Sequence, residues 1–261
     1  MLFLVSRLSS RISNLHTSDK HCTFAVSVSA MKYKHLFFDL DHTLWDFEAN
    51  ARMTLEELYH ALELHAHGVD DFNSFYDRYI YHNTRLWERY RKGFIKRDDL
   101  RWKRMWNTLL DFKIGNEQLA RSMDVMFLDK LPTRKLLFPY AVEILHYLRD
   151  KGYALHLITN GFETVQHSKL KYSGLSEFFK FVITSEGSNS LKPHKAIFDF
   201  ALRKTGAALQ ESIMLGDDID ADIIGARDAG MDQVYVNHLG VIPPVQPTYM
   251  VNSLKELEEI F

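Results

Sequence analysis

After Pro139 the sequence alternates short apolar runs with segments of helical periodicity, and this alternation limits the possible folds more than any other feature. The apolar runs are "YALHLIT", "FFKFVIT", "SIMLGD" and "DQVYVN", and helical segments separate them. Short continuous apolar runs are typical of strands buried on both faces, as in a parallel sheet. Repeated strand–helix units therefore predict an α/β fold with a doubly wound parallel sheet.

The first strand of this sheet is expected far upstream, at "HLFFDL", which starts at His35. Between about Asn50 and about Lys135 the pattern is different, because apolar residues recur at helical spacing and glycines separate the segments. The sequence therefore predicts an α/β core made of residues 31–48 and 136–261. A helical-bundle cap at residues 49–135 interrupts this core.

Residues 1–30 have a different composition, rich in serine and with one acidic residue, Asp19. Organelle transit segments share this composition. We favour an N-terminal extension that is disordered or not native, because "MKYKHLFFDLD" from Met31 leads directly into a strand.

Charge and cysteine content exclude several classes of protein. Lys+Arg 32 against Asp+Glu 34 gives a formal charge of -2, which argues against a nucleic-acid polymer as partner. The single cysteine, Cys22, fits a reducing compartment, so we expect a cytoplasmic location. No apolar stretch approaches the roughly 20 residues of a membrane span, so we expect no membrane partner. Nothing in the sequence specifies an oligomeric state.

Polar residues follow four of the expected strands, at the edge where parallel α/β sheets bind ligands. These residues are Asp39, Asp41 and Thr43 after the first strand, Thr159, Asn160 and Gly161 after the second, Lys192 after the third, and Asp217, Asp218, Asp220 and Asp222 after the fourth. We expect them to meet at one site.

So many carboxylates at one point repel each other unless a cation compensates them. Mg²⁺ prefers a few carboxylates and takes phosphate oxygens as further ligands. Lys192 adds a positive charge, and the side chains of Thr159 and Asn160 can hydrogen-bond phosphate oxygens. The set is typical of phosphoryl transfer, in which Asp39 and Asp41 can divide the tasks of nucleophile and proton carrier.

The motifs "DLDHT", "TNG", "KP" and "GDDIDAD" resemble, in this order, the four motifs of the haloacid dehalogenase-like hydrolases. The resemblance covers Lys34 to Phe261 and implies a Rossmann-like core, and the position of the cap resembles the helical-cap subclass. "ITNGFETVQHSKLKYSGLSEFFKFVITSE" and "LKPHKAIFDFAL" further resemble the branch of bacterial pyrimidine 5′-nucleotidases.

The resemblance implies Asp39 as nucleophile and Asp41 as general acid and base. It implies Mg²⁺ held by Asp39, by the backbone carbonyl of Asp41 and by Asp217. Thr159 and Lys192 would bind the phosphoryl group, and Lys192 would also restrain Asp39.

Supporting roles are expected for further motif residues. Asn160 and Gly161 would complete the phosphate-binding set. Asp222 fits an acid that holds a metal-bound water, Asp218 is a further candidate beside the metal, and Thr43 would steady the turn.

Several functions follow from these motifs. The first is a Mg²⁺-dependent phosphomonoesterase for a small phosphorylated metabolite, a nucleoside monophosphate. The alternatives are a phosphatase or phosphomutase for sugar phosphates, a carbon–halogen hydrolase, and a catalytically silent binding protein. Asp41 and the acids from Asp217 onward argue against the carbon–halogen hydrolase. No motif acid is missing, which argues against the silent protein.

Three further expectations concern residues outside the motif roles. Strand alternation would point His42 away from the site, so we expect it to be structural. We expect Asp46 to cap the first cap helix. The tryptophans between Trp45 and Trp106 are expected to pack between cap helices rather than stack on a base.

Overall fold

The computed structural model describes residues 31–261, so the expectation for residues 1–30 lies outside the described part. In the described part six parallel strands form one sheet in the order β3-β2-β1-β4-β5-β6. The strands are β1 (His35–Phe38), β2 (Ala154–Thr159), β3 (Phe181–Thr184), β4 (Ser212–Gly216), β5 (Asp232–Val236) and β6 (Tyr249–Val251). The predicted α/β parallel sheet is confirmed, and β6 is an addition that the sequence pattern did not indicate.

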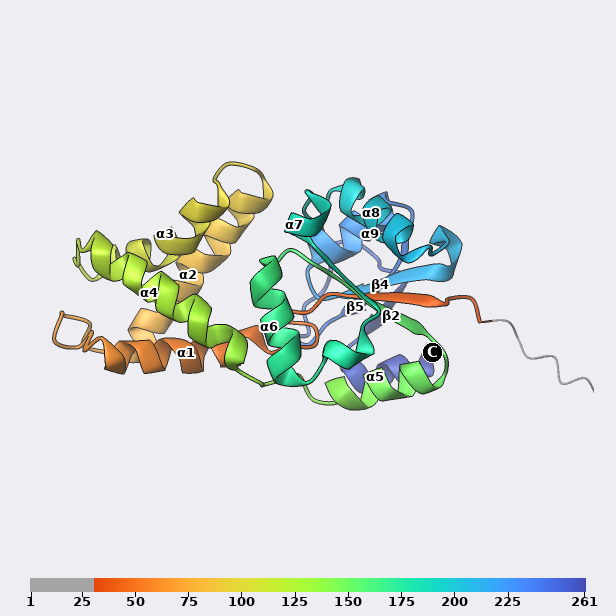
Figure 1. The fold of residues 1–261 in the computed structure, drawn as a ribbon, viewed down its shortest axis with the longest axis horizontal. Helices are drawn as coiled ribbons and strands as arrows, with labels where there is room; N and C mark the ends of the chain where they lie inside the picture. The colour runs from red at the N-terminus through yellow and green to blue at the C-terminus, as the bar shows by residue number, and fades with distance from the viewer. Residues whose placement is uncertain (1–30) are drawn as a thin grey trace, which may run out of the picture. The chain divides into compact units, whose positions relative to one another are not determined.

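Strand β1 lies between β2 and β4, in the middle of the sheet, and its apolar residues are buried. Successive side chains of a strand point to opposite faces. Phe37 therefore packs with Phe198 of helix α8 (Lys195–Thr205), while Leu36 and Phe38 join the apolar cluster that contains Leu145 of helix α5 (Ala141–Asp150). Helices cover both faces of the sheet (Figure 1), and the acids that follow β1 lie at its carboxyl edge.

The helices of the α/β part follow the expected alternation with local differences. They are α5 (Ala141–Asp150), α6 (Glu163–Ser173), α7 (Ser185–Ser188), α8 (Lys195–Thr205) and α9 (Gly225–Asp228). The segment before α9 is a π-helix, η4 (Ile219–Ile224). The short 3₁₀ segments are η1 (Leu131–Thr133), η2 (Ser176–Phe178), η3 (Leu209–Glu211) and η5 (Leu254–Glu259).

Four longer helices follow β1 in the chain before α5. They are α1 (Phe47–Ala61), α2 (Phe72–Arg91), α3 (Arg97–Asp111) and α4 (Glu117–Lys130). Buried side chains such as Phe75, Tyr79, Leu109 and Phe127 form their core. The helical block is thus present where the sequence indicated it, and its assignment to residues 49–135 as a separate cap stays a prediction. Within residues 31–261 no helix is long and apolar enough to cross a membrane.

The chain enters and leaves these four helices at neighbouring positions, which hydrogen bonds hold together. Asp46 is the N-cap of α1, as expected, and its Oδ1 accepts a hydrogen bond from the Ala49 amide at 2.9 Å. The buried side chain of Asn50 donates to the Leu136 carbonyl at 2.8 Å and accepts from the Leu136 amide at 3.1 Å. These bonds join the outgoing and returning segments next to the carboxyl end of β1.

We expect Asp46→Ala to lower the free energy of unfolding by about 1 kcal/mol, because α1 loses its N-terminal cap. The melting temperature should fall by about 2–4 °C for a chain of this size. Asp46→Asn is the matched control, since asparagine also caps helices, and it should melt close to the wild type. Equal melting of Asp46→Ala and the wild type would contradict the capping role.

Candidate active site

Asp39 and Asp41 follow β1 where the chain turns toward α1. The Asp39 amide donates to the Leu215 carbonyl of β4 at 2.8 Å, so Asp39 remains in register with the sheet, and its side chain is buried. Beyond Asp41 the backbone adopts a positive φ of 62° at His42, which ends the strand geometry. The two carboxylates therefore leave the turn toward different neighbours.

The Asp39 carboxylate meets two acids that follow β4. Carboxylate oxygens of Asp39, Asp217 and Asp222 lie within 4.8 Å of one another. Gly216 makes this approach possible, because a Cβ atom there would lie 2.2 Å from Asp222 Oδ2. Thr43 donates its hydroxyl hydrogen to Asp217 Oδ1 at 2.8 Å, so it orients one of the acids as well as the turn.

Burial of these acids raises their pKa values strongly. The pKa of Asp39 rises to about 7, that of Asp222 to about 7 and that of Asp217 to about 8, where the charge of Asp222 adds to the effect of burial. Three acids in this state need protons or a cation to balance them. A set of closely spaced carboxylate oxygens fits the ligand preference of Mg²⁺.

Lys192 supplies a fixed positive charge in the same cluster. Its Nζ donates to Asp39 Oδ1 at 2.5 Å, to Asp222 Oδ1 at 2.6 Å and to the Ile158 carbonyl at 2.8 Å, and the residue is only 2% exposed. Burial alone would lower the pKa of Lys192, but the charges of Asp222 and Asp39 raise it overall. The lysine therefore stays protonated and holds one oxygen of Asp39.

The side chain of Asn160 is hydrogen-bonded within the protein. Its Oδ1 accepts from the Lys192 amide at 2.8 Å, and its Nδ2 donates to the Lys192 carbonyl at 2.9 Å. The side chain thus clamps the backbone of Lys192, because the loop after β3 runs beside the end of β2. These contacts position the lysine, and the phosphate-binding role expected of Asn160 stays a prediction.

Thr159 is prepared to donate a hydrogen bond into the site. Its Oγ1 accepts from Gln166 Nε2 at 2.7 Å and from the Gly161 amide at 3.1 Å, which leaves the hydroxyl hydrogen available. Gly161 also permits the approach of Gln166, since a Cβ atom there would lie 2.0 Å from Gln166 Nε2. Glycine is needed here for space.

Asp41 is held by two side chains of α6 that the sequence reasoning missed. Lys169 Nζ donates to Asp41 Oδ1 at 2.5 Å, and Gln166 Nε2 donates to Asp41 Oδ2 at 2.8 Å. Both side chains are buried, and Lys169 Nζ also lies 4.3 Å from the centre of the Trp45 ring. The i, i+3 spacing of a glutamine and a lysine on the buried face of the helix after "TNG" was the available signal.

A cavity of about 340 Å³ joins these groups to helix α2. The α2 residues that line it are Asn83, Thr84, Trp87 and Arg91. Arg91 Nη1 pairs with Asp218 Oδ2 at 2.6 Å, and Trp87 stacks on Phe162 with ring centres 5.7 Å apart. Asp218 therefore links the α/β part to α2, and Trp87 of α2 lines the cavity.

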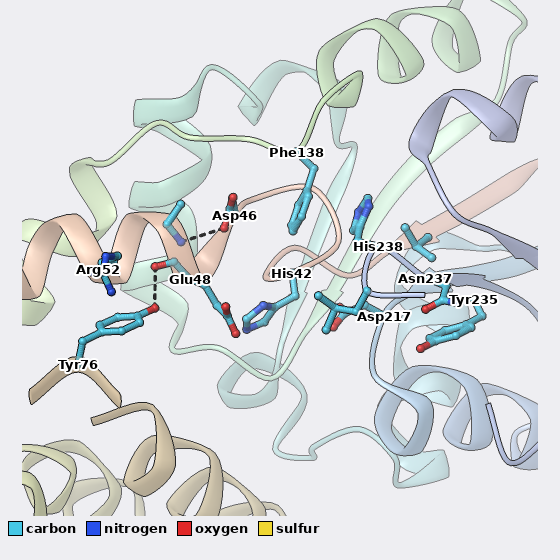
Figure 2. A pocket seen from close by; sticks show the side chains of 13 residues that line it. His42, Asp46, Glu48, Arg52, Tyr76, Phe138, Asp217, Tyr235, Asn237 and His238 are labelled. Atoms are coloured by element: carbon cyan, nitrogen blue, oxygen red, sulfur yellow. Dashed lines mark hydrogen bonds between the residues drawn. The ribbon is translucent and has the colours of Figure 1, made fainter. Parts of the chain in front are cut away.

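A second cavity of about 450 Å³ shares His42, Glu48, Asp217 and Leu239 with the first. Figure 2 shows the His42 side chain directed into this second cavity. The expectation that His42 points away from the site was wrong, since His42 also lines the first cavity. Its left-handed backbone conformation interrupts the strand alternation on which that expectation was based. On the same rim His238 Nε2 donates to the Thr43 carbonyl at 3.0 Å.

A parallel α/β sheet with a lysine-bound aspartate and a carboxylate cluster at its carboxyl edge defines a phosphoryl-transfer type of hydrolase. The family model of the haloacid dehalogenase-like hydrolases matches residues 33–230. The chain therefore belongs to this family, and it is a phosphatase of the haloacid dehalogenase-like superfamily.

Relatives of known name agree with this membership. The pyrimidine 5′-nucleotidase PynA of Streptococcus pneumoniae is 31% identical over 87% of this chain and 94% of its own length. A glyceraldehyde 3-phosphate phosphatase of Methanothermobacter thermautotrophicus is 30% identical over 78% of this chain and 85% of its own length. The solved structure of the HAD-hydrolase YfnB from Bacillus subtilis, bound to magnesium, is 27% identical with a TM-score of 0.79, covering 88% and 98% of the two chains.

The raised pKa values predict how metal removal depends on pH. Acids whose pKa is higher in the folded than in the unfolded chain stabilise the fold at low pH and lose this contribution as pH rises through the folded value. After treatment with EDTA, the contribution of Asp39, Asp217 and Asp222 should fall as pH rises from about 4 toward 8. Magnesium can replace the protons, so it should raise the melting temperature more at about pH 8.5 than at about pH 5.5.

Thermal unfolding with EDTA and with added magnesium at both pH values measures this difference. Asp217→Asn removes one of the three titrating acids, so it should make the magnesium-induced gain in melting temperature differ less between the two pH values. An equal gain from magnesium at the two pH values would contradict the prediction.

The contacts of Asp41 predict an effect that depends on the leaving group. Lys169→Met removes one of the two contacts that hold Asp41 in position. Because a displaced Asp41 would protonate the leaving oxygen less well, kcat/KM for alkyl phosphates should fall by roughly tenfold or more. p-Nitrophenyl phosphate should lose less, because its phenolate leaves without needing a proton. Lys171→Met, on the exposed side of α6, is the control and should leave both values unchanged. Equal losses for both substrates would rule out a role in proton transfer.

Proposed function

We propose that this phosphatase is a Mg²⁺-dependent enzyme that forms an aspartyl-phosphate at Asp39 and hydrolyses pyrimidine nucleoside 5′-monophosphates. The observation that carries the proposal is the buried Asp39 carboxylate, one oxygen of which is bound by protonated Lys192 at 2.5 Å. A carboxylate restrained in this way presents its second oxygen, Oδ2, for attack on phosphorus.

Asp41 is the proposed proton carrier. In the first half-reaction the bond from Asp39 to phosphorus forms, the ester bond breaks, and Asp41 gives its proton to the leaving oxygen. In the second, water attacks phosphorus, its proton passes to Asp41, and the bond from Asp39 to phosphorus breaks. The two donors on α6 hold Asp41 at a separate place from the acid cluster, which supports this division of roles.

Residues around Asp39 and Asp41 would receive the phosphoryl group. Thr159 can donate its free hydroxyl hydrogen to a phosphoryl oxygen, and Lys192 lies beside the attacking carboxylate. Asp39 and Asp217 would hold magnesium together with the Asp41 carbonyl, and Asp222 lies close enough to support them. When bound, the ion supplies positive charge that compensates both the acids and the phosphoryl oxygens. The magnesium named for the YfnB structure supports this assignment.

The nucleotide assignment is supported by two pyrimidine 5′-nucleotidases among the relatives, which are 31% and 29% identical to this chain over 87% and 88% of its length. The glyceraldehyde 3-phosphate phosphatase described above is 30% identical. A cavity of about 340 Å³ lies within the range of small-molecule sites. A phosphatase or phosphomutase for sugar phosphates is the second candidate, favoured by the similar identity of the glyceraldehyde 3-phosphate phosphatase.

A substrate panel tests the proposal. With magnesium, kcat/KM for UMP, dUMP and dTMP should exceed that for ribose 5-phosphate and glucose 6-phosphate by roughly tenfold or more. EDTA should stop turnover and magnesium restore it. Asp39→Asn should abolish turnover while the circular dichroism spectrum stays unchanged, because the two side chains have nearly equal volume.

Sugar phosphates that rank with or above the nucleotides would overturn the nucleotide assignment. Conversion of a sugar phosphate to its isomer without phosphate release would establish a mutase. Retained activity of Asp39→Asn would overturn the nucleophile assignment, and halide release from a 2-haloacid would favour the carbon–halogen hydrolase.

A further inference from the structure

Asn83 is a buried amide on the wall of the active-site cavity. It lies on α2, is 7% exposed and lines the same cavity as Asp39 and Asp41. Its Oδ1 accepts a hydrogen bond from Arg104 Nη1 at 3.3 Å. Its Nδ2 has no hydrogen-bond partner among residues 31–261. Nδ2 is therefore available to donate a hydrogen bond to a ligand acceptor in the cavity that Asn83 lines.

The buried guanidinium of Arg104 determines which way this amide faces. Arg104, on α3, is 2% exposed and pairs with the buried carboxylate of Asp124 on α4 at 3.4 Å. Arg101 holds the other oxygen of Asp124 at 3.2 Å. An arginine side chain has only donors, so Asn83 must turn its oxygen toward Arg104 and its nitrogen toward the cavity. The orientation of the amide thus follows from its chemistry.

An aromatic ring lies one helical turn farther along the same wall. Trp87 lines the cavity and is held by stacking on Phe162, with an angle of 28° between the rings. An immobilised ring beside a fixed amide donor is complementary to a planar heterocycle that carries a carbonyl group. A sugar phosphate has no such planar group.

We propose that Asn83 is a specificity-determining residue that donates a hydrogen bond from Nδ2 to a ring carbonyl oxygen of a pyrimidine base, while Arg104 and Asp124 position it. This inference rests on the proposed nucleotidase function and assigns the base-recognising part of its site. Recognition of a carbonyl by a positioned donor selects strongly, because a leaving group without the acceptor leaves the amide unpaired.

Asn83→Asp tests the donor while it preserves the structural contact. Aspartate keeps the oxygen that Arg104 binds, and it places a second acceptor where Nδ2 faced the cavity. We expect the ratio of kcat/KM for UMP to that for ribose 5-phosphate to fall by roughly tenfold or more. The added negative charge repels both phosphate esters, so the ratio isolates the contact with the base.

Uridine supplies a second measurement that is free of phosphate charge. As a competitive inhibitor of p-nitrophenyl phosphate hydrolysis, it should bind Asn83→Asp roughly tenfold more weakly than the wild type. Asn73→Asp is the matched control, since it makes the same chemical change on the exposed side of α2. It should leave both the ratio and the inhibition constant unchanged.

Thermal unfolding checks that Asn83→Asp is folded. If it is not, Asn83→Ser, which retains an oxygen but cannot reach the base, should show the same losses. An unchanged substrate ratio or an unchanged uridine constant would overturn the assignment of Asn83. A wild type that does not prefer nucleotides would instead overturn the proposed function, so the two failures are distinguishable.

Discussion

The ion pair between Lys192 and Asp39 is the interaction on which the rest of the site depends. A buried ammonium group is costly unless it is paired and hydrogen-bonded. Here two carboxylates and one carbonyl satisfy all three of its donors. The same contacts restrain Asp39 and compensate part of the charge of Asp222. Asn160 fixes the lysine backbone, so the end of β2 indirectly positions the nucleophile expected at the end of β1.

Helix α6 holds Asp41, the expected proton carrier, through contacts that Asp39 does not share. Gln166 donates to both Thr159 and Asp41, and it occupies the space that a side chain at position 161 would fill. One buried amide therefore couples the expected phosphate-binding hydroxyl to the expected acid and base. With Lys169 it gives Asp41 an environment unlike that of Asp39, although the two acids are only two residues apart. Different environments allow two carboxylates to play different chemical roles.

The helical block contributes chemistry of its own to the cavity. Arg91 pairs with Asp218 across the site, and the network behind Asn83 reaches through α3 to α4. A small bundle buries charged groups only when their partners are close. The burial of Arg104 and Asp124 behind Asn83 therefore links the packing of the bundle to the cavity wall where we propose that the base is recognised.

The sequence by itself determined the strand–helix alternation, the helical insertion and the gathering of acids and a lysine at one sheet edge, because parallel strands place their carboxyl ends together. Tertiary structure alone decided the partners of each side chain. Asn160 binds the Lys192 backbone, His42 enters a cavity through a left-handed turn, and α6 and α2 bring Lys169 and Asn83 to the site. Such contacts depend on how helices distant in sequence pack against one another, and a local sequence pattern does not specify that packing.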